Sequence, residues 1–279
     1  MIRLGEKQTL QIVKKVDFGV YLATPQGDPE EGILLPLKQV PPGAETGVSM
    51  EVFVYRDSQD RLIATVHTPK LVMGEVAELR VAQTGKFGAF LDWGLEKDLL
   101  LPFRQQTKTV EEGENVLAAL YIDKSGRLCA TMNVYPYLRT DSPYRKDERV
   151  TGRVYETSEE FGAFVAVDNL YSALIPRKEL YGQAVAVGED VSARVTEVKE
   201  DGKLSLSLRE KAYIQMGKDA EEILGLLERC GGRLSFYDRS SPETIKEATG
   251  MSKKEFKRAV GNLLKAGKIE IVGQSIRRK

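Results

Sequence analysis

A short motif, in which two aromatic residues flank a glycine and a small apolar residue, recurs three times along this chain. Its six aromatic positions are Phe18, Tyr21, Phe87, Phe90, Phe161 and Phe164. The flat faces of aromatic rings stack well on unpaired nucleobases. The motif therefore predicts recognition of a flat ligand.

The glycine inside the motif decides where the two rings point. In a straight strand, residues three positions apart face opposite sides, so one ring would pack in a core and the other outside. A glycine between them permits a bulge or a tight bend that brings both rings to one outer surface. Because the glycine recurs in all three copies, we expect the bend and favour an exposed pair of rings over simple core packing.

Charged residues recur near the end of each copy. Asp57 and Arg61 are four residues apart in the first copy, as are Asp123 and Arg127 in the second. An arginine held by a nearby carboxylate is well placed to bind a phosphate or a base. The matching positions of the third copy are Lys199 and Lys203, which keep positive charge without the acid. The alternative is that these are ordinary exposed turn charges.

The spacing of these motifs defines a repeating unit of about 70 residues. Each copy contains five short segments that alternate apolar and polar residues, with Gly, Asp and Pro between them. Such segments favour a small closed barrel over an open sheet. The predicted domains are a first barrel over 1–68, a second over 69–136, a linker over 137–147 and a third barrel over 148–210.

The remaining residues, 211–279, show helical spacing followed by a final alternating segment. Ser241 and Pro242 predict the start of one helix, and Ser252 with Glu255 forms the capping-box pattern of another. Helices followed by a terminal hairpin are typical of a winged helix-turn-helix. The predicted fold class is therefore multi-domain and mainly β, with three tandem five-stranded oligonucleotide-fold barrels and an α+β winged helix.

Charge is distributed unevenly although the net charge of the whole chain is zero. Residues 211–279 hold 15 Lys and Arg against 9 Asp and Glu, a net charge of +6 that the rest of the chain balances. Part of this positive charge lies on the outer face of one predicted helix, at Lys253, Lys254, Lys257 and Arg258. A phosphate backbone is the partner that such a face fits. The alternative is a solvated face or a protein contact.

Other classes of protein fit the sequence poorly. No run approaches the ~18 apolar residues of a membrane span, and the first residues lack an apolar targeting core, so we expect a cytoplasmic protein that contacts no membrane. His67 is the only histidine, and Cys129 and Cys230 lack metal-ligand spacing. No glycine-rich phosphate loop with lysine is present. We therefore expect no enzymatic activity, no cofactor and no metal.

Each copy resembles the RNA-binding oligonucleotide-fold domain first described in small-subunit ribosomal protein one. The third copy carries this likeness best, through Gly152-Arg153-Val154, Phe161 to Val165 and Lys203 to Leu208. A histidine usual in the third strand is replaced by proline in every copy, at Pro36, Pro102 and Pro176. Three such domains and a winged helix resemble, over the whole chain, the conserved virulence factor B (YitL) family.

This resemblance implies a cytoplasmic RNA-binding regulator that affects the expression of virulence factors. It also implies that the aromatic positions and the charged hairpin positions contact nucleic acid. We therefore expect a non-catalytic protein that binds single-stranded RNA, with the ribosome or RNA-processing machinery as further partners. One alternative is a transcription factor that binds duplex DNA through the winged helix. Another is an adaptor on the ribosome or on an RNA-degradation complex.

Overall fold

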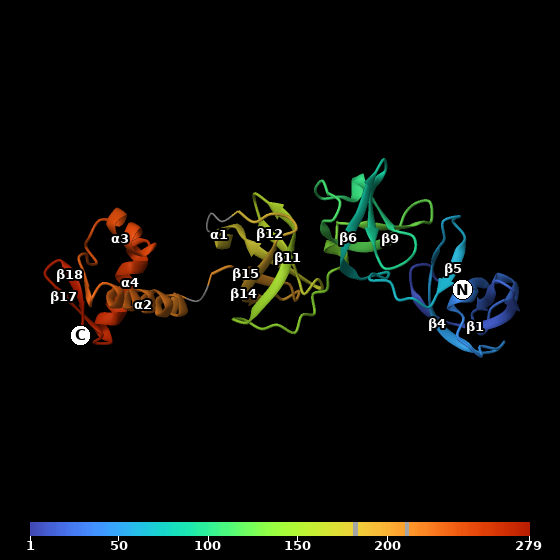
Figure 1. The fold of residues 1–279 in the computed structure, drawn as a ribbon, viewed down its shortest axis with the longest axis horizontal. Coiled ribbons are helices and arrows are strands. Elements are labelled where there is room, and N and C mark those ends of the chain that lie inside the picture. Colours follow the sequence, from blue (N-terminus) through green and yellow to red (C-terminus); the bar gives the residue numbers. More distant parts are fainter. Residues whose placement is uncertain (181–183, 210–211) are drawn as a thin grey trace. The chain divides into compact units, whose positions relative to one another are not determined.

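The alternating segments form strands in all three copies. The computed structural model describes residues 1–180, 184–209 and 212–279, and it divides into two compact units, Met1–Leu208 and Arg209–Lys279. The first unit holds the three five-stranded domains and the second holds the winged helix (Figure 1). The predicted boundary between the third barrel and the winged helix, at residues 210–211, lies outside the described residues.

The first barrel is a closed sheet with the strand order β1-β2-β3-β5-β4. Strands β3 and β5 pair in parallel and close the barrel, whereas the other pairs are antiparallel. Apolar residues that alternate along the strands fill its interior. The strands are β1 (Lys7–Val16), β2 (Gly19–Ala23), β3 (Ile33–Pro36), β4 (Ser49–Arg56) and β5 (Leu62–Thr65).

The other two barrels repeat this plan. The third is closed in the same order, and the second is a five-stranded sheet in the order β10-β9-β6-β7-β8 that is nearly closed, with β8 beside β10. The second consists of β6 (Val76–Gly85), β7 (Gly88–Asp92), β8 (Leu99–Pro102), β9 (Asn115–Ile122) and β10 (Leu128–Thr131). The third consists of β11 (Arg149–Ser158), β12 (Gly162–Val167), β13 (Tyr171–Pro176), α1 (Arg177–Leu180), β14 (Asp190–Val198) and β15 (Leu204–Ser207).

A β-bulge interrupts the first strand of each barrel at the same place. The pairing register shifts between Ile12 and Lys14, between Val81 and Gln83, and between Val154 and Glu156. A bulge bends its strand and increases the local twist. The bend lets one ten-residue strand pair with the second strand along one half and with the fourth strand along the other, which a small closed barrel requires.

The first two barrels share one apolar core at their junction. Side chains alternate along β4. Val52 and Val54 fill the core of the first barrel, so Phe53 and Tyr55 point outward from it. Both rings pack edge-on against Trp93, with centroid separations of 5.7 Å and 6.4 Å. Trp93 is only 3% exposed. The junction is therefore a packed interface rather than a flexible connection.

The second and third barrels meet in a similar way. Leu117 and Ala119 point outward from β9 and join an apolar cluster that includes Val134, Tyr155 and Ala166. An ion pair crosses the same junction, in which Arg153 Nη1 lies 3.1 Å from Glu78 Oε1. The other side of the same guanidinium is bound by Asp190, at 2.8 Å for each of two hydrogen bonds.

The segment after the second barrel packs along the third. The backbone N–H of Arg139 donates to the Leu170 carbonyl, and that of Ser172 donates to the Arg139 carbonyl. The hydroxyl of Tyr144 donates to Asp168 at 2.5 Å. These bonds tie the segment predicted as a linker to the barrel that follows it.

At one outward position of the fourth strand, the third barrel has a cation where the first two barrels have apolar residues. Phe53, Ala119 and Arg194 occupy equivalent positions, since each pairs with the matching residue of its fifth strand. Arg194 forms an ion pair with Asp147, with 3.0 Å between Nη1 and Oδ1. The apolar docking face is thus present on the two barrels that are followed by another barrel, and absent from the last.

The second unit is a winged helix with a core of its own. The Ser241 hydroxyl caps α3, and Ser252 with Glu255 forms a reciprocal capping box on α4, as the sequence predicts. A three-stranded sheet in the order β16-β18-β17 completes the domain. Its elements are α2 (Ala212–Arg229), β16 (Arg233–Leu234), α3 (Pro242–Thr249), α4 (Lys253–Lys265), β17 (Ile269–Val272) and β18 (Ser275–Arg278).

The shared core predicts that truncating Phe53 destabilises the junction. Phe53→Ala leaves a cavity against Trp93, and we expect it to lower the free energy of unfolding by about 3–5 kcal/mol. Urea denaturation followed through the fluorescence of Trp93, the only tryptophan, measures this change. Glu51→Ala is the matched control, because Glu51 is exposed on the same strand. Equal midpoints for the two variants would contradict a shared core.

Candidate nucleic-acid interface

The motif glycine lets two strands approach closely in every barrel. Gly19, Gly88 and Gly162 pair with Pro36, Pro102 and Pro176, the last residues of the leucine–proline and isoleucine–proline segments. Their φ angles lie between 116° and 156°, where side chains are rarely tolerated. A Cβ at any of the three would collide with a backbone carbonyl oxygen of the facing strand. The two motifs recur together because they form one contact.

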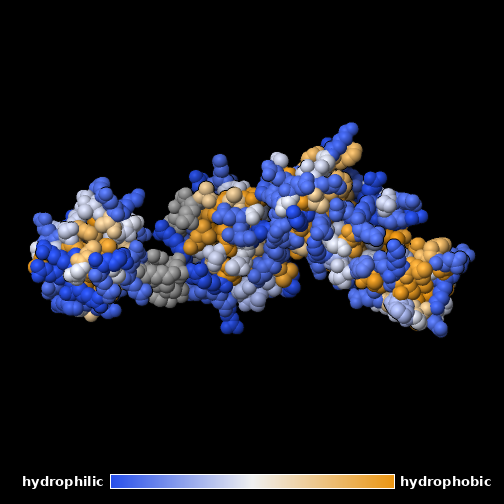
Figure 2. Space-filling model, in the orientation of Figure 1, coloured by the Kyte–Doolittle hydropathy of each residue, from blue (hydrophilic) through white to orange (hydrophobic). Residues whose placement is uncertain are grey.

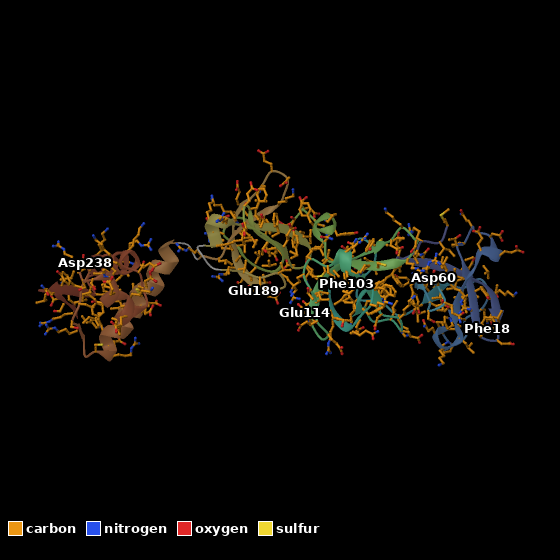
Figure 3. The ribbon with its side chains drawn as sticks, turned by 90° about the horizontal axis from the view of Figure 1, so that it is seen from above. Phe18, Asp60, Phe103, Glu114, Glu189 and Asp238 are labelled. Atoms are coloured by element: carbon orange, nitrogen blue, oxygen red, sulfur yellow. The ribbon has the colours of Figure 1, made fainter. Side chains whose placement is uncertain are left out.

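The first ring of each motif lies outside the barrel. Phe18 is 58% exposed, Phe87 is 71% exposed and Phe161 is 55% exposed. Figure 3 labels Phe18 on the first barrel, and Figure 2 shows apolar residues reaching the surface among the polar ones. A large apolar side chain that stays mostly exposed at the same position of three barrels is typical of a binding surface.

The second ring is half-buried in every copy, and its surroundings differ. In the third barrel the centroids of Phe161 and Phe164 are 6.5 Å apart, so this copy brings the pair together. Phe164 also packs against the apolar cluster at the junction with the second barrel. In the second barrel Phe90 borders a cavity. The expectation of one outer surface for both rings therefore fits the third copy best.

Two exposed apolar residues next to the motif were missed by the sequence reasoning. Leu37 and Phe103 follow the proline of the first and second copies, and both side chains are exposed. Their backbone N–H groups donate to the carbonyls of Phe18 and Phe87, which places each beside the first ring of its motif. Figure 3 labels Phe103 on the second barrel. The signal was an apolar residue directly after the proline, and in the third copy this position is Arg177.

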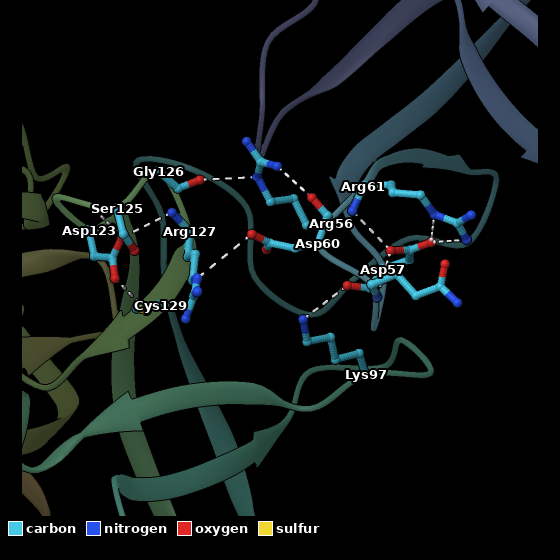
Figure 4. A network of polar contacts seen from close by, with 11 residues as sticks. Arg56, Asp57, Asp60, Arg61, Lys97, Asp123, Ser125, Gly126, Arg127 and Cys129 are labelled. Carbon is cyan, nitrogen blue, oxygen red and sulfur yellow. Dashed lines mark hydrogen bonds and ion pairs between the residues drawn. The ribbon is translucent and has the colours of Figure 1, made fainter.

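The charged pair of the first hairpin forms as expected. Asp57 accepts two hydrogen bonds from the Arg61 guanidinium, at 2.9 Å and 2.7 Å, and further bonds from the backbone N–H groups of Gln59 and Arg61 (Figure 4). Burial alone would raise the pKa of Asp57, but the bonds from Arg61 and Gln59 hold it below its usual value. Arg61 remains exposed and keeps donors for a phosphate.

The pair of the second hairpin differs. Asp123 binds the Ser125 hydroxyl and the backbone N–H of Arg127, and these bonds lower the pKa of Asp123. The Arg127 guanidinium instead lies 3.8 Å from Asp60 of the first barrel (Figure 4). The carboxylate that faces this arginine thus comes from another domain, which the spacing of Asp123 and Arg127 did not predict.

The third hairpin does have an acid, contrary to the sequence reasoning. Asp201, two residues before Lys203, forms an ion pair with its ammonium group at 2.7 Å. The same ammonium lies 5.8 Å from the ring centroid of Tyr135, an exposed residue of the segment between the barrels. The backbone N–H of Lys199 donates to the Lys203 carbonyl across the hairpin. Lys203 is therefore held in place, as the arginine positions of the other copies are.

The basic face of the winged helix belongs to α4. Phe256, Ala259, Val260 and Leu263 are buried against the domain core, so the remaining positions face outward. Four of these positions carry the cations that the sequence predicts for this face. Lys254, Lys257 and Arg258 are exposed, and Lys253 is half-buried. The capping box fixes the first turn of α4, where these charges begin.

The acidic residues and the cysteines of the described ranges form neither a metal cluster nor a disulfide. In the part of the chain that the structure describes, no three His, Cys, Asp or Glu residues lie close enough together to hold a metal ion. No described helix has both the length and the apolar character needed to cross a bilayer. Cys129 is buried and Cys230 is exposed, and neither forms a disulfide. Burial raises the pKa of the Cys129 thiol to about 11, with a smaller contribution from Asp123.

Comparisons with known proteins match every domain of the chain. A CvfB-like winged helix domain matches residues 221–277, an S1 domain matches 4–67 and again 73–133, and an S1 RNA binding domain matches 144–209. YitL of Bacillus subtilis is 33% identical over 96% of this chain and 91% of its own. Conserved virulence factor B of Staphylococcus aureus strain N315 is 29% identical over 81% of this chain and 78% of its own.

A solved structure also shares the fold. The crystal structure of a Streptococcus pneumoniae multidomain protein with nucleic acid binding domains matches with a TM-score of 0.50 and 24% identity, over 99% of this chain and 98% of that one. The chain belongs to the family of YitL and conserved virulence factor B. The predicted family and the predicted fold class are confirmed.

The two cysteines are expected to react differently with thiol reagents. At pH 8, a thiol with a pKa of about 11 is ionised in only about one molecule in a thousand, and burial further hinders attack. We therefore expect an aromatic disulfide reagent to modify one thiol promptly, and the second only after denaturant is added. Cys230→Ser should remove the fast phase. A fast phase that survives in this variant would mean that Cys129 is accessible.

Proposed function

We propose that this member of the family is a non-catalytic RNA-binding protein that holds single-stranded RNA on its three barrels and regulates gene expression after transcription. The observation that carries the proposal is the exposed first ring of each motif, Phe18, Phe87 and Phe161. The match of residues 144–209 to an S1 RNA binding domain supports the same reading.

Stacking explains why the rings are exposed. A phenylalanine at the surface costs solubility and adds nothing to the barrel core, whereas one base stacked on it contributes about 1–3 kcal/mol with little dependence on sequence. A duplex keeps its bases stacked on each other, so its base faces are inaccessible to such rings. Single strands are therefore the favoured ligand, and the flanking residues Leu37 and Phe103 would extend the first two platforms.

Several weak platforms act together when they are linked. The proline positions of this chain replace a histidine that the family's domain usually has, which removes one contact from each platform. Binding to a second barrel is then intramolecular, and the high effective concentration compensates for the weakness of each site. The packed junctions support this mechanism, because they fix the spacing of the platforms within Met1–Leu208.

The winged helix is proposed to add affinity through the phosphate backbone. The face formed by Lys253, Lys254, Lys257 and Arg258 offers ammonium and guanidinium donors that suit phosphate oxygens. Contacts of this kind raise affinity for all sequences alike. The hairpin cations Arg61, Arg127, Lys199 and Lys203 are proposed to do the same on the barrels, with Asp57 and Asp123 positioning their hairpins.

The proposed biological setting takes its lead from the names of the relatives. Some are named conserved virulence factor B, and we propose that this chain acts in the cytoplasm on transcripts of virulence factors. Ribosomal or RNA-processing partners are compatible with this role. Duplex-DNA binding through α4 is the second candidate, because a basic helix of a winged helix is the usual element that enters a groove.

Competition between ligands tests the substrate class. A fluorescent single-stranded RNA bound to the full chain should be displaced by unlabelled single strands at lower concentration than by RNA or DNA duplexes of equal length. Binding should weaken as salt rises, because phosphate contacts release counterions. Fluorescence anisotropy measures both effects. Equal or tighter binding to duplex DNA would favour the transcription-factor candidate instead.

Removing a platform should weaken binding without unfolding the barrel. We expect Phe87→Ala and Phe103→Ala each to cost about 1–3 kcal/mol of RNA-binding free energy, since each removes one stacking surface. Both residues are exposed, so the melting temperature should stay close to that of the wild type. Phe53→Ala provides the contrast of a core aromatic. Unaltered RNA affinity in both surface variants would exclude this platform.

A further inference from the structure

A small cavity lies where the first barrel packs on the second. Its volume is about 170 Å³, and aromatic residues from both barrels line it: Tyr55 from β4, Phe90 from β7 and Trp93 just after β7. Leu100, which pairs with Phe90 across β7 and β8, adds an apolar side. The cavity therefore exists only because the two barrels are docked.

The size of the cavity limits what it can hold. A void of about 150 Å³ accommodates one benzene ring, whereas pockets for drug-sized ligands measure about 300–1,000 Å³. A cavity of 170 Å³ with aromatic walls thus suits a single flat heterocycle, with any attached groups left in solvent. Phe90, the second ring of the aromatic motif, forms part of this wall.

The polar groups around the cavity are held by contacts between the barrels. Arg56 donates from Nε to the Gly126 carbonyl at 3.2 Å, and Lys97 donates from Nζ to the Asp57 carbonyl at 3.1 Å (Figure 4). Arg127 and Asp60 face each other at 3.8 Å, and both side chains are at least half exposed. This long ion pair at the rim leaves Arg127 donors available to a phosphate outside the cavity.

One acidic residue of the lining lacks a cation. Asp98 is half-buried, and among the described residues no side chain forms an ion pair with it. Burial raises the pKa of its carboxyl, and nearby Asp92 adds to the effect. A partly desolvated carboxylate gains strongly from a hydrogen-bond donor. A carboxylate acceptor in such a wall suits ligands that carry N–H groups better than ligands that present carbonyl oxygens.

At the next junction the same motif has different surroundings. Phe164, the counterpart of Phe90, packs against an apolar cluster of Leu117, Ala119, Val134 and Leu138. The motif alone therefore does not produce the cavity. It depends on the particular residues that the first barrel and the β7–β8 loop contribute.

We propose that this cavity takes one unstacked nucleobase, and that Asp98 makes it prefer guanine to uracil. Guanine places its N1–H and its exocyclic amino group side by side, which a carboxylate can accept together, whereas uracil flanks its single N3–H with carbonyl oxygens. The base comes either from a nucleotide within RNA or from a free mononucleotide. The first source rests on the RNA-binding function proposed above, and the second does not.

Trp93 makes the proposal directly measurable, because it lines the cavity and is the only tryptophan. Four ligands are titrated into the full chain while its fluorescence is recorded: GMP, UMP, a single-stranded heptamer of uridine and the same heptamer with a central guanosine. We expect a saturable change with the guanine ligands, at about tenfold lower concentration than with the uracil ligands, because one bidentate pair typically provides such discrimination.

Two variants and a control assign the effect to the cavity. Asp98→Asn should reduce the preference for guanine to less than about twofold, since an amide is no longer a double acceptor. Leu100→Phe should fill the cavity and abolish the fluorescence change, while heptauridine still binds elsewhere, as anisotropy would show. Glu96→Gln is the matched control, because Glu96 is an exposed neighbour outside the cavity and should behave as wild type.

The outcomes separate this site from the general RNA-binding function. A guanine-dependent change with the heptamer alone assigns the site to RNA, and a change with GMP alone assigns it to a free nucleotide. If the heptamers bind by anisotropy but the Trp93 fluorescence and the base preference do not depend on Asp98 or Leu100, the cavity proposal is overturned and RNA binding stands. If no RNA binds at all, the proposed function fails, whatever GMP does.

Discussion

The packing of Trp93 against Phe53 and Tyr55 is the interaction on which the geometry of the first two barrels depends. Its indole N–H donates to the Lys97 carbonyl at 2.6 Å, so the ring satisfies its polar group while it fills the junction. Edge-to-face contacts of this kind contribute about 0.5–1.5 kcal/mol each beyond the area they bury. The same contact holds the β7–β8 loop, and thus Lys97 and Asp98, beside the first barrel.

A second constraint operates inside each barrel. Because the motif glycine has no side chain, the facing strand can approach it closely. The phenylalanine before the glycine lies just outside the paired strands, and its ring is exposed to solvent. Phe18, Phe87 and Phe161 each accept a backbone hydrogen bond from the residue that follows the proline. The exposed ring and the close strand contact are therefore two results of one local geometry. Each exposed ring therefore lies in the short turn between the first two strands of its barrel, and this backbone hydrogen bond anchors the turn.

The sequence was sufficient for the barrels and insufficient for their junctions. Alternation predicts which residues of β4 share a face, but it does not say whether the outer face meets water or another domain. Phe53 and Tyr55 look like ordinary strand residues until the second barrel is present. The partner of Arg127 is likewise Asp60, 67 positions earlier in the chain and in another barrel. Asp57 and Arg61, by contrast, are four residues apart in one turn and could be paired from local spacing.

The polar outer face at Arg194 in the third barrel has a consequence for how the protein is made. During synthesis the first barrel is complete before Trp93 has been added, so Phe53 and Tyr55 stay uncovered until enough of the second barrel has emerged to dock on them. Ribosomes add about 5–20 residues per second, and exposed aromatic surface favours aggregation during that interval. The second barrel passes through a similar stage at Leu117 and Ala119. At the matching position the third barrel carries Arg194, paired with Asp147, so the closure of its strands leaves a charged side chain there in place of an apolar one.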